Sequence, residues 1–277
     1  TFEVCEETKK KLEELKTQKK KKKRRPKIKF KKRKPCEISE REQIEEECNK
    51  LMKEKHRNDL DFEEIHKYTM VLGKKYYDEY EYWMKVGWAL KNSNYDLFWT
   101  WMLLSSKSDK FNYDEIEVWK DKWDNEFNDG GLTCGSIRFW AKESNFDEFK
   151  EIRDGSIQSH IQKTIANYTD FDIANVLYLL FREEFVLAAH KDKKWFRFKQ
   201  NRWVSSEKGS ALRLELSKTV SKIYLKNEQE MVDKVCESTE DNEQLNCSRK
   251  AAKYAEIGLK LRKTPQKNNI MIEAADL

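Results

Sequence analysis

The fold is decided by the stretch Ile173–Ile223, which begins with the helix-like run Ile173-Ala-Asn-Val-Leu-Tyr-Leu-Leu-Phe181. Two short runs rich in β-formers follow it, Phe185-Val-Leu-Ala-Ala189 and Trp195-Phe-Arg-Phe198. A tight connection, Lys199-Gln-Asn-Arg202, leads to Trp203-Val204, and a second helical run begins at Ala211. The order predicts a short antiparallel β-meander near residues 185–204, packed on helices because so small a sheet is not stable alone.

The meander carries basic and aromatic side chains together. At a period of two, Trp195 and Arg197 face one side of the sheet, and Phe196 and Phe198 face the other. One interpretation is a surface for single-stranded DNA; the other is that the rings are core and the charges are solvated. The most plausible exposed contact is the loop His190-Lys-Asp-Lys-Lys194. The candidate binding residues here are Lys193, Lys194, Arg197, Arg202 and Lys208.

An aromatic block precedes this stretch, from Tyr76 to Trp140. Apolar and aromatic residues recur in it at helical spacing, which predicts four short helices. The four faces are Tyr76, Tyr80, Trp83, Gly87 and Leu90; Leu97, Trp101 and Leu104; Ile116, Trp119, Trp123 and Phe127; and Ile137, Trp140 and Ala141. Large rings supply much buried area per residue, so we interpret them as core. The alternative is a base-stacking platform.

The N-terminal part is strongly basic. Residues 9–34 contain 17 Lys and Arg against 2 Glu, a local charge of +15, so the rest of the chain must carry −9 to reach the total of +6. Self-repulsion and the lack of apolar spacing predict a disordered linker over residues 1–36. Two further interpretations are a nuclear import signal and a phosphate binder that acts by counterion release. The candidate contacts are Lys21, Lys22, Lys23, Arg24, Arg25, Lys31, Lys32 and Arg33.

The remaining segments are polar. Charge alternation over Glu37–Val71 predicts surface helices with His56, His66 and the pair Glu63-Glu64 facing solvent. The sequence predicts a polar connector over Glu143–Asn167, with a break at Asp154-Gly-Ser156. It further predicts an acidic loop or frayed helix over Asn227–Asn246, then a basic helix over Lys250–Lys263. Thr133 is a candidate helix N-cap, and either Thr169 or Asp170 caps a later helix.

Several function classes are excluded by what the sequence lacks. It has no Gly-x4-Gly-Lys-Ser/Thr phosphate loop, no Gly-x-Ser-x-Gly elbow and no His-Glu-x-x-His motif. Its six cysteines form no Cys-x-x-Cys pair, and no His lies at zinc-finger spacing. No apolar run approaches the ~20 residues of a membrane span. We therefore expect no catalytic centre, no metal site and no membrane contact, and a reducing, intracellular setting.

Two stretches carry a family resemblance. The order of helix, aromatic hairpin and helix resembles the domain just before the ATPase in poxvirus-type primase–helicases and their phage relatives. Its carrying residues are Phe185, His190, Trp195, Phe196, Phe198, Arg202, Trp203, Leu212, Arg213 and Ser217. The earlier block resembles the small helical module that follows the primase domain in these proteins. It is carried by Tyr77-Asp-Glu-Tyr80, Trp83-Met-Lys-Val-Gly87-Trp-Ala-Leu90, Phe98-Trp-Thr-Trp101, Trp119, Trp123, Thr133-Cys-Gly135-Ser and Trp140-Ala-Lys142. The chain departs from the family pattern at one point: where the family usually has Trp-Ser after the second helix, this sequence has Trp101-Met102.

The resemblance implies a mainly α chain of two small helical domains, the second with the β-meander. The expected parts are a basic linker (1–36), a helical lead-in (37–70), a primase C-terminal-type module (71–150), a connector (151–165) and a helicase-preceding domain (166–277). The chain would be the non-catalytic middle of a viral primase–helicase, linking a primase to a superfamily 3 helicase. ATP and Mg would bind only in that downstream helicase. The implied partners are DNA, the adjacent domains and a possible hexamer, at a viral replication site in the host cytoplasm or nucleus.

Two other functions remain open from the residues. One is a stand-alone single-stranded nucleic-acid-binding module that uses the basic segment and the hairpin. The other is a structural protein whose helical bundles bind replication factors. The two differ in whether the folded part retains DNA affinity at physiological salt once the basic segment is removed.

Overall fold

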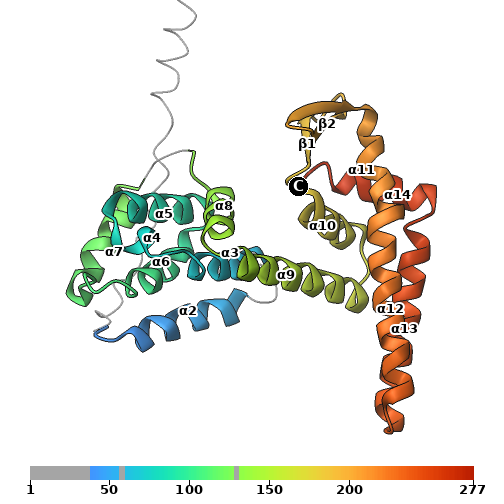
Figure 1. Ribbon diagram of the computed structural model, residues 1–277, viewed down its shortest axis with the longest axis horizontal. Helices are drawn as coiled ribbons and strands as arrows, with labels where there is room; N and C mark the ends of the chain where they lie inside the picture. The colour runs from blue at the N-terminus through green and yellow to red at the C-terminus, as the bar shows by residue number, and fades with distance from the viewer. Residues whose placement is uncertain (1–37, 56–59, 128–130) are drawn as a thin grey trace, which may run out of the picture. The chain divides into compact units, whose positions relative to one another are not determined.

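The computed structural model describes residues 38–55, 60–127 and 131–277. The basic segment and His56, on which some predictions fall, lie outside the described residues. The fold is mainly α with a small three-stranded antiparallel sheet, as the sequence predicts (Figure 1). Residues 38–277 form one unit by their contacts. Within it are two hydrophobic clusters, one from Ile38 to Phe149 and one from Ile157 to Ile270.

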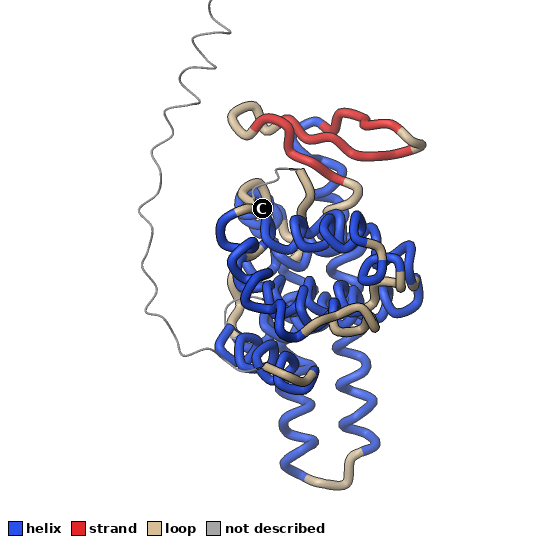
Figure 2. The backbone as a smooth tube through the Cα atoms, turned by 90° about the vertical axis from the view of Figure 1, so that its left-hand side faces the viewer, coloured by secondary structure: helices blue, strands red, loops and turns tan. Residues whose placement is uncertain are grey.

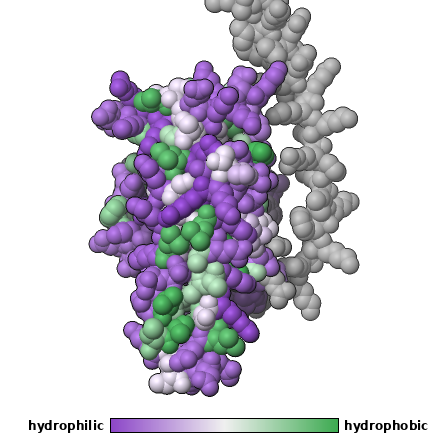
Figure 3. All heavy atoms as spheres, turned by 90° about the vertical axis from the view of Figure 1, so that its right-hand side faces the viewer, coloured by the Kyte–Doolittle hydropathy of each residue, from purple (hydrophilic) through white to green (hydrophobic). Residues whose placement is uncertain are grey.

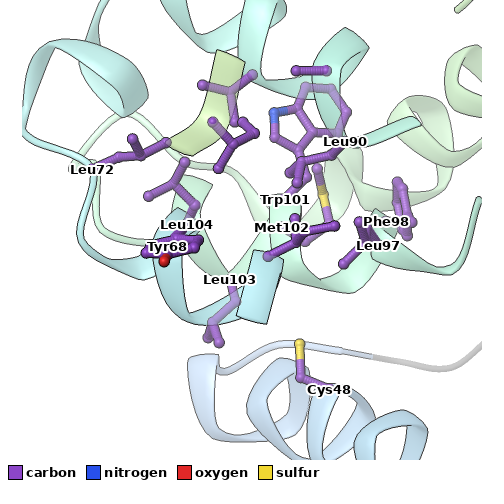
Figure 4. Packing of buried hydrophobic residues seen from close by; sticks show 14 of the residues in the cluster. Cys48, Tyr68, Leu72, Leu90, Leu97, Phe98, Trp101, Met102, Leu103 and Leu104 are labelled. Carbon is purple, nitrogen blue, oxygen red and sulfur yellow. The ribbon is translucent and has the colours of Figure 1, made fainter. Parts of the chain in front are cut away.

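Helix α6 (Phe98–Ser105) lies at the centre of the first cluster, and every residue in it except Trp99 is buried (Figure 4). Such a helix has no solvent face, so it needs neighbours on all sides. Those in contact with it include α2, α3, α5 and α7. The helices around it are α2 (Arg41–Lys55), α3 (Leu60–Met70), α4 (Lys75–Asp78), α5 (Tyr80–Ser93), α7 (Ile116–Asn125) and α8 (Cys134–Ser144), with 3-10 turns at Tyr95–Leu97 and Tyr113–Glu115.

Indole rings fill this cluster. Trp101 and Trp123 are fully buried and stacked, with ring centroids 5.6 Å apart, and Phe98 meets Trp123 edge-on at 5.5 Å. Trp83 and Trp119 are partly buried against the cluster. The prediction that the aromatic stripes form a core is therefore confirmed for the central rings. Thr133 is the N-cap of α8, in a capping box with Ser136, as its position indicates.

Gly87 on α5 lies tightly against the rings of Trp101 and Phe127. A Cβ atom there would lie 2.8 Å from Cε2 of Trp101 and 2.9 Å from Cε2 of Phe127. We expect Gly87→Ala to lower the free energy of unfolding by about 1–3 kcal/mol, because overpacking exceeds the gain in helix propensity. Urea unfolding measures this, with Gly155→Ala as control. A Cβ at Gly155 meets nothing within 4 Å, so that change should stabilise the protein slightly; equal stability of the two variants would contradict the close approach.

The predicted connector is instead one uninterrupted helix, α9 (Phe146–Ala166), so the break expected at Asp154-Gly-Ser156 is wrong. Asn145 caps the helix by accepting a hydrogen bond from the amide of Glu148. Phe149 packs in the first cluster, whereas Ile157 and Ile161 pack in the second. Burial at both ends outweighs the roughly 1 kcal/mol that an exposed helical glycine costs relative to alanine.

The second cluster gathers helices around α10 (Asp170–Phe181), which is buried on most sides. Thr169 caps α10 by accepting a hydrogen bond from the amide of Asp172, which confirms the predicted cap. The other elements are strands β1 (Phe185–Ala189), β2 (Lys194–Lys199) and β3 (Arg202–Ser206), a 3-10 turn (Glu207–Gly209), α11 (Ser210–Glu215), a π-helical turn (Leu216–Val220), α12 (Ser221–Glu237), α13 (Asp241–Lys260) and α14 (Thr264–Glu273).

The acidic segment Asn227–Asn246, predicted as a loop or frayed helix, is helical apart from the turn at residues 238–240. It forms the end of an antiparallel hairpin of α12 and α13, whose two helices run side by side (Figure 2). Exposed apolar residues on these helices include Val232, Leu245 and Leu259. Hydrophobic residues also gather in a band on the side of the molecule drawn in Figure 3. The acidic segment is helical because α12 and α13 bury side chains against each other, and this packing is not evident from the composition of the segment alone.

His66 on α3 is buried, not solvent-exposed as predicted. Its Nδ1 shares a 2.8 Å hydrogen bond with Oγ1 of Thr100 on α6. Burial, with a smaller effect of Lys67, lowers the pKa of His66 to about 4, so the imidazole is neutral at pH 7. It is therefore a core polar group and not a surface charge.

Candidate nucleic-acid interface

The sheet has the order β1-β2-β3 with antiparallel neighbours. A two-residue turn joins β2 to β3, and both of its residues, Gln200 and Asn201, have positive φ (52° and 58°). Such a turn matches the twist of the strands on either side of it. It pairs Phe198 with Trp203 and Arg197 with Val204. Because directly paired residues share a face, this register decides which side chains lie together.

One face of the sheet is aromatic and exposed. It carries Phe196, Phe198 and Trp203, with Val186 paired to Phe196 from β1. Phe198 is 41% and Trp203 51% exposed, and their ring centroids lie 5.2 Å apart across the strands. Lys194 places its ammonium 5.6 Å from the Phe196 ring. This outer face, which we define as Val186, Lys194, Phe196, Phe198 and Trp203, combines stacking surfaces with a positive charge.

The opposite face packs inward. Trp195 is buried in the second cluster, and Gly209, at φ 69°, has room for no side chain because a Cβ would meet Trp195 and Met271. Arg197 lies 5.0 Å from the Phe185 ring and pairs with Glu184 at 3.2 Å and Glu215 at 3.8 Å. Arg197 is thus held within the protein, on the face away from Trp203.

The structure separates the predicted basic residues. Lys193, Lys194, Arg202 and Lys208 are exposed, and Lys194 lies on the outer face. Arg202 pairs with Lys199 and shares its face with Arg197. His190, at the start of the loop, forms a 2.8 Å contact with Asp276. The eight predicted residues from Lys21 to Arg33 lie outside the described part of the chain.

A second group of polar side chains, which the sequence did not predict, connects α3 to the end of α10 through hydrogen bonds and an ion pair. The carboxylate of Glu64, 1% exposed, accepts two hydrogen bonds from the guanidinium of Arg182 at 2.9 and 3.2 Å. Arg138 of α8 approaches the same carboxylate at 3.8 Å, and the Tyr68 hydroxyl donates to it at 3.2 Å. The interpretation of Glu63-Glu64 as a solvated pair is wrong for Glu64.

At this junction between α3 and α10, the buried negative charge of Glu64 is paired with the positive charge of Arg182. Burial alone would lower the pKa of Arg182, but the Glu64 carboxylate raises it above its ordinary value. Burial, then the same carboxylate, raises the pKa of Tyr68. A bidentate Arg–carboxylate pair of this kind is both strong and directional. It fixes the end of α10 to α3, which are 118 residues apart in sequence.

The described residues offer no assembled metal centre, since no three His, Cys, Asp or Glu side chains in them come together in a suitable group. Within the same residues, no helix combines the length and apolar character that crossing a bilayer requires.

Comparison with known proteins shows what the chain is similar to. Residues 65–141, from α3 to α8, match the family described as Primase C terminal 2 (PriCT-2). Three viral relatives are a candidate helicase of Frog virus 3 (26% identical over 154 residues, 54% of this chain and 15% of the relative), a candidate helicase of Acanthamoeba polyphaga mimivirus (21% over 201 residues, 72% and 20%) and a candidate primase of African swine fever virus (28% over 145 residues, 48% and 15%).

The chain thus spans a fifth or less of the length of these relatives. The match covers the aromatic stripes from which the resemblance was inferred, and the relatives come from large DNA viruses. The comparisons support the resemblance stated from the sequence: residues 65–141 match a primase C-terminal family, and the chain is similar to part of primase and helicase proteins of large DNA viruses.

Proposed function

We propose that this chain is the non-catalytic middle region of a viral replication protein, which couples a primase to a superfamily 3 DNA helicase. The relatives, which are described as a viral helicase and a viral primase, support a replication role; the coupling is our own addition. ATP and Mg would act in the helicase, and a hexamer would form in the full-length protein. Both of these rest on the resemblance.

One observation carries the proposal: the two clusters are joined by a continuous helix and locked by a buried ion pair. Helix α9 contributes Phe149 to the first cluster and Ile161 to the second. Glu64 and Arg182 hold α3 against the end of α10. A flexible tether would let two catalytic domains move independently, whereas a helix packed at both ends transmits orientation.

The neighbouring gene sequence tests the assignment. We expect a Gly-x4-Gly-Lys-Ser/Thr phosphate loop downstream of residue 277 within roughly 200 codons, about one domain length. Its absence from that interval, and from any adjacent reading frame, would refute the coupling to a helicase. A primase-type acidic motif upstream is expected as well.

We further propose that the outer face of the sheet binds single-stranded DNA. Trp203→Ala should weaken binding of a fluorescent oligo-dT about 5- to 150-fold, since stacking of one base on an aromatic ring contributes ~1–3 kcal/mol. Fluorescence polarisation at two salt concentrations measures the effect. Trp203→Phe should retain most of the affinity. Phe139→Ala, which removes a similarly exposed ring on α8 (58% exposed), is the control; equal effects from the two alanine variants would exclude the outer face.

The basic segment needs a separate test, because residues 9–34 carry +15 and the rest of the chain −9. Removal of residues 1–35 should reduce affinity for every sequence and flatten the salt dependence. Residual affinity that is sensitive to Trp203→Ala would assign part of the binding to the folded body. A complete loss at physiological salt would assign all of it to the basic segment.

A further inference from the structure

A pocket of about 210 Å³ opens in the first cluster, away from the sheet. It lies between the start of α5, the end of α6 and the start of α7. Five of its lining side chains are aromatic: Tyr77, Tyr80, Trp83, Phe111 and Trp119. Neither the fold nor the DNA-binding proposal uses this pocket.

Two indoles form walls at right angles. The rings of Trp83 and Trp119 meet at 84° with centroids 4.6 Å apart. Tyr80, which is 67% exposed, stands 5.9 Å from Trp83 at a tilt of 49°. Trp83 is fixed from behind by stacking on buried Trp101 at 4.6 Å, and its Nε1 donates to Oγ of Ser105 at 2.7 Å. The walls are therefore pre-organised and need not be ordered by a ligand.

Two carboxylates complete the lining. Asp78 accepts a 2.6 Å hydrogen bond from Oγ of Ser108, which together with Lys74 holds the pKa of Asp78 below its ordinary value. Glu115 accepts a 3.3 Å hydrogen bond from Nε1 of Trp119, so its charge lies beside the indole edge. The one lysine in the lining, Lys110, donates to the main-chain oxygen of Asp78 at 3.0 Å.

Aromatic faces and ionised carboxylates together favour a cation. One indole of the pocket already interacts with one, because the ammonium of Lys122 lies 4.1 Å from the centroid of the Trp119 ring. We propose that the pocket binds the guanidinium of an arginine in a basic segment of a partner protein. A guanidinium stacks on indole and forms paired hydrogen bonds with a carboxylate, which a lysine ammonium cannot match.

The same chemistry disfavours a nucleobase as the occupant. A base in the pocket would bring its phosphates toward Asp78 and Glu115, and like charges repel. The body of the chain outside residues 9–34 also carries −9. At the pocket itself, the charges of Asp78 and Glu115 favour a basic peptide over a polyanion.

Nuclear magnetic resonance of the indole N–H groups tests the proposal on the full chain. The chain has nine tryptophans, and the indole signals of Trp83 and Trp119 are assigned with Trp→Phe variants. Titration with N-acetyl-arginine amide should shift these two signals. The lysine analogue should bind more weakly, and the neutral citrulline analogue should leave the signals in place. Equal shifts with arginine and citrulline would overturn the cation assignment.

Two variants locate the site. Tyr80→Ala and Glu115→Gln should each weaken arginine binding about 2- to 30-fold, the range of a cation–π or paired-charge contact. Tyr80 is largely exposed, so its removal should leave the melting temperature unchanged, and Phe139→Ala controls for the loss of an exposed ring. Affinity unaltered by both variants, or stronger shifts of the same signals by oligo-dT than by an arginine-rich peptide, would refute the proposal.

Discussion

Replacing Trp123 with alanine is expected to lower the free energy of unfolding by about 3–5 kcal/mol, the cost of a large cavity in a packed core. The ring is fully buried, stacks with Trp101 and donates from Nε1 to the main-chain oxygen of Tyr95 at 3.1 Å. Its removal takes away that hydrogen bond and empties the space beside Phe98. Urea unfolding, monitored by circular dichroism, gives the midpoint concentration of urea and the slope from which the free energy of unfolding is obtained.

Two comparisons make this test specific. Phe139→Ala removes a ring that is 58% exposed and should change stability by no more than about 0.5 kcal/mol. Trp83→Ala should fall between the two, because Trp83 is only partly buried. An unchanged midpoint for Trp123→Ala would show that the ring lies outside the core.

The second large effect is expected at the junction. Glu64→Ala leaves the guanidinium of Arg182, whose side chain is 7% exposed, buried without its carboxylate, and should cost about 3–5 kcal/mol. Arg182→Ala should lower the free energy of unfolding by a similar amount, because it leaves the Glu64 carboxylate buried without its guanidinium partner. The double variant Glu64→Leu with Arg182→Met should recover most of the loss, since a buried ion pair can be replaced by apolar side chains with little net change.

A double-mutant cycle in urea measures the coupling, and hydrogen exchange shows where it acts. If Glu64 joins the two clusters, Glu64→Ala should increase exchange at the end of α10 as well as in α3. A cost below about 1 kcal/mol, typical of exposed pairs, would mean that the pair is solvated. Faster exchange confined to α3 would mean that the pair does not connect the clusters.

Periodic segments could be predicted from the sequence with good accuracy. The stripes containing Trp101 and Trp123 predicted buried helices, because residues three or four apart share a helical face. Alternation at a period of two predicted that Trp195 and Phe196 face opposite sides of the sheet, and the register confirms it. Both rules depend only on neighbours in sequence, so no tertiary information was needed.

Predictions based on polarity failed where a distant segment supplies the burial. The sequence indicated a broken connector at Gly155, but α9 continues through it because each end packs in a different cluster. The acidic segment after Asn227 was expected to be a loop, yet it pairs with α13 as a hairpin. Of the candidate binding residues, Lys194 lies on the outer face, whereas Arg197 is paired with Glu184 and Glu215; DNA contact by any of them stays a prediction.

By itself, the sequence determined the class of the fold, the positions of its aromatic helices and its β-meander, and the family to which it is similar. All of these follow from local spacing and order, which the chain carries in any conformation. Only the tertiary structure decided that Glu64 and His66 are buried, that Arg197 is a structural ion-pair residue, and that Trp83 and Trp119 frame a pocket with Asp78 and Glu115. The physical reason is that burial and charge pairing depend on which distant segments meet, and a charged residue looks the same in sequence whether water or a counter-charge surrounds it.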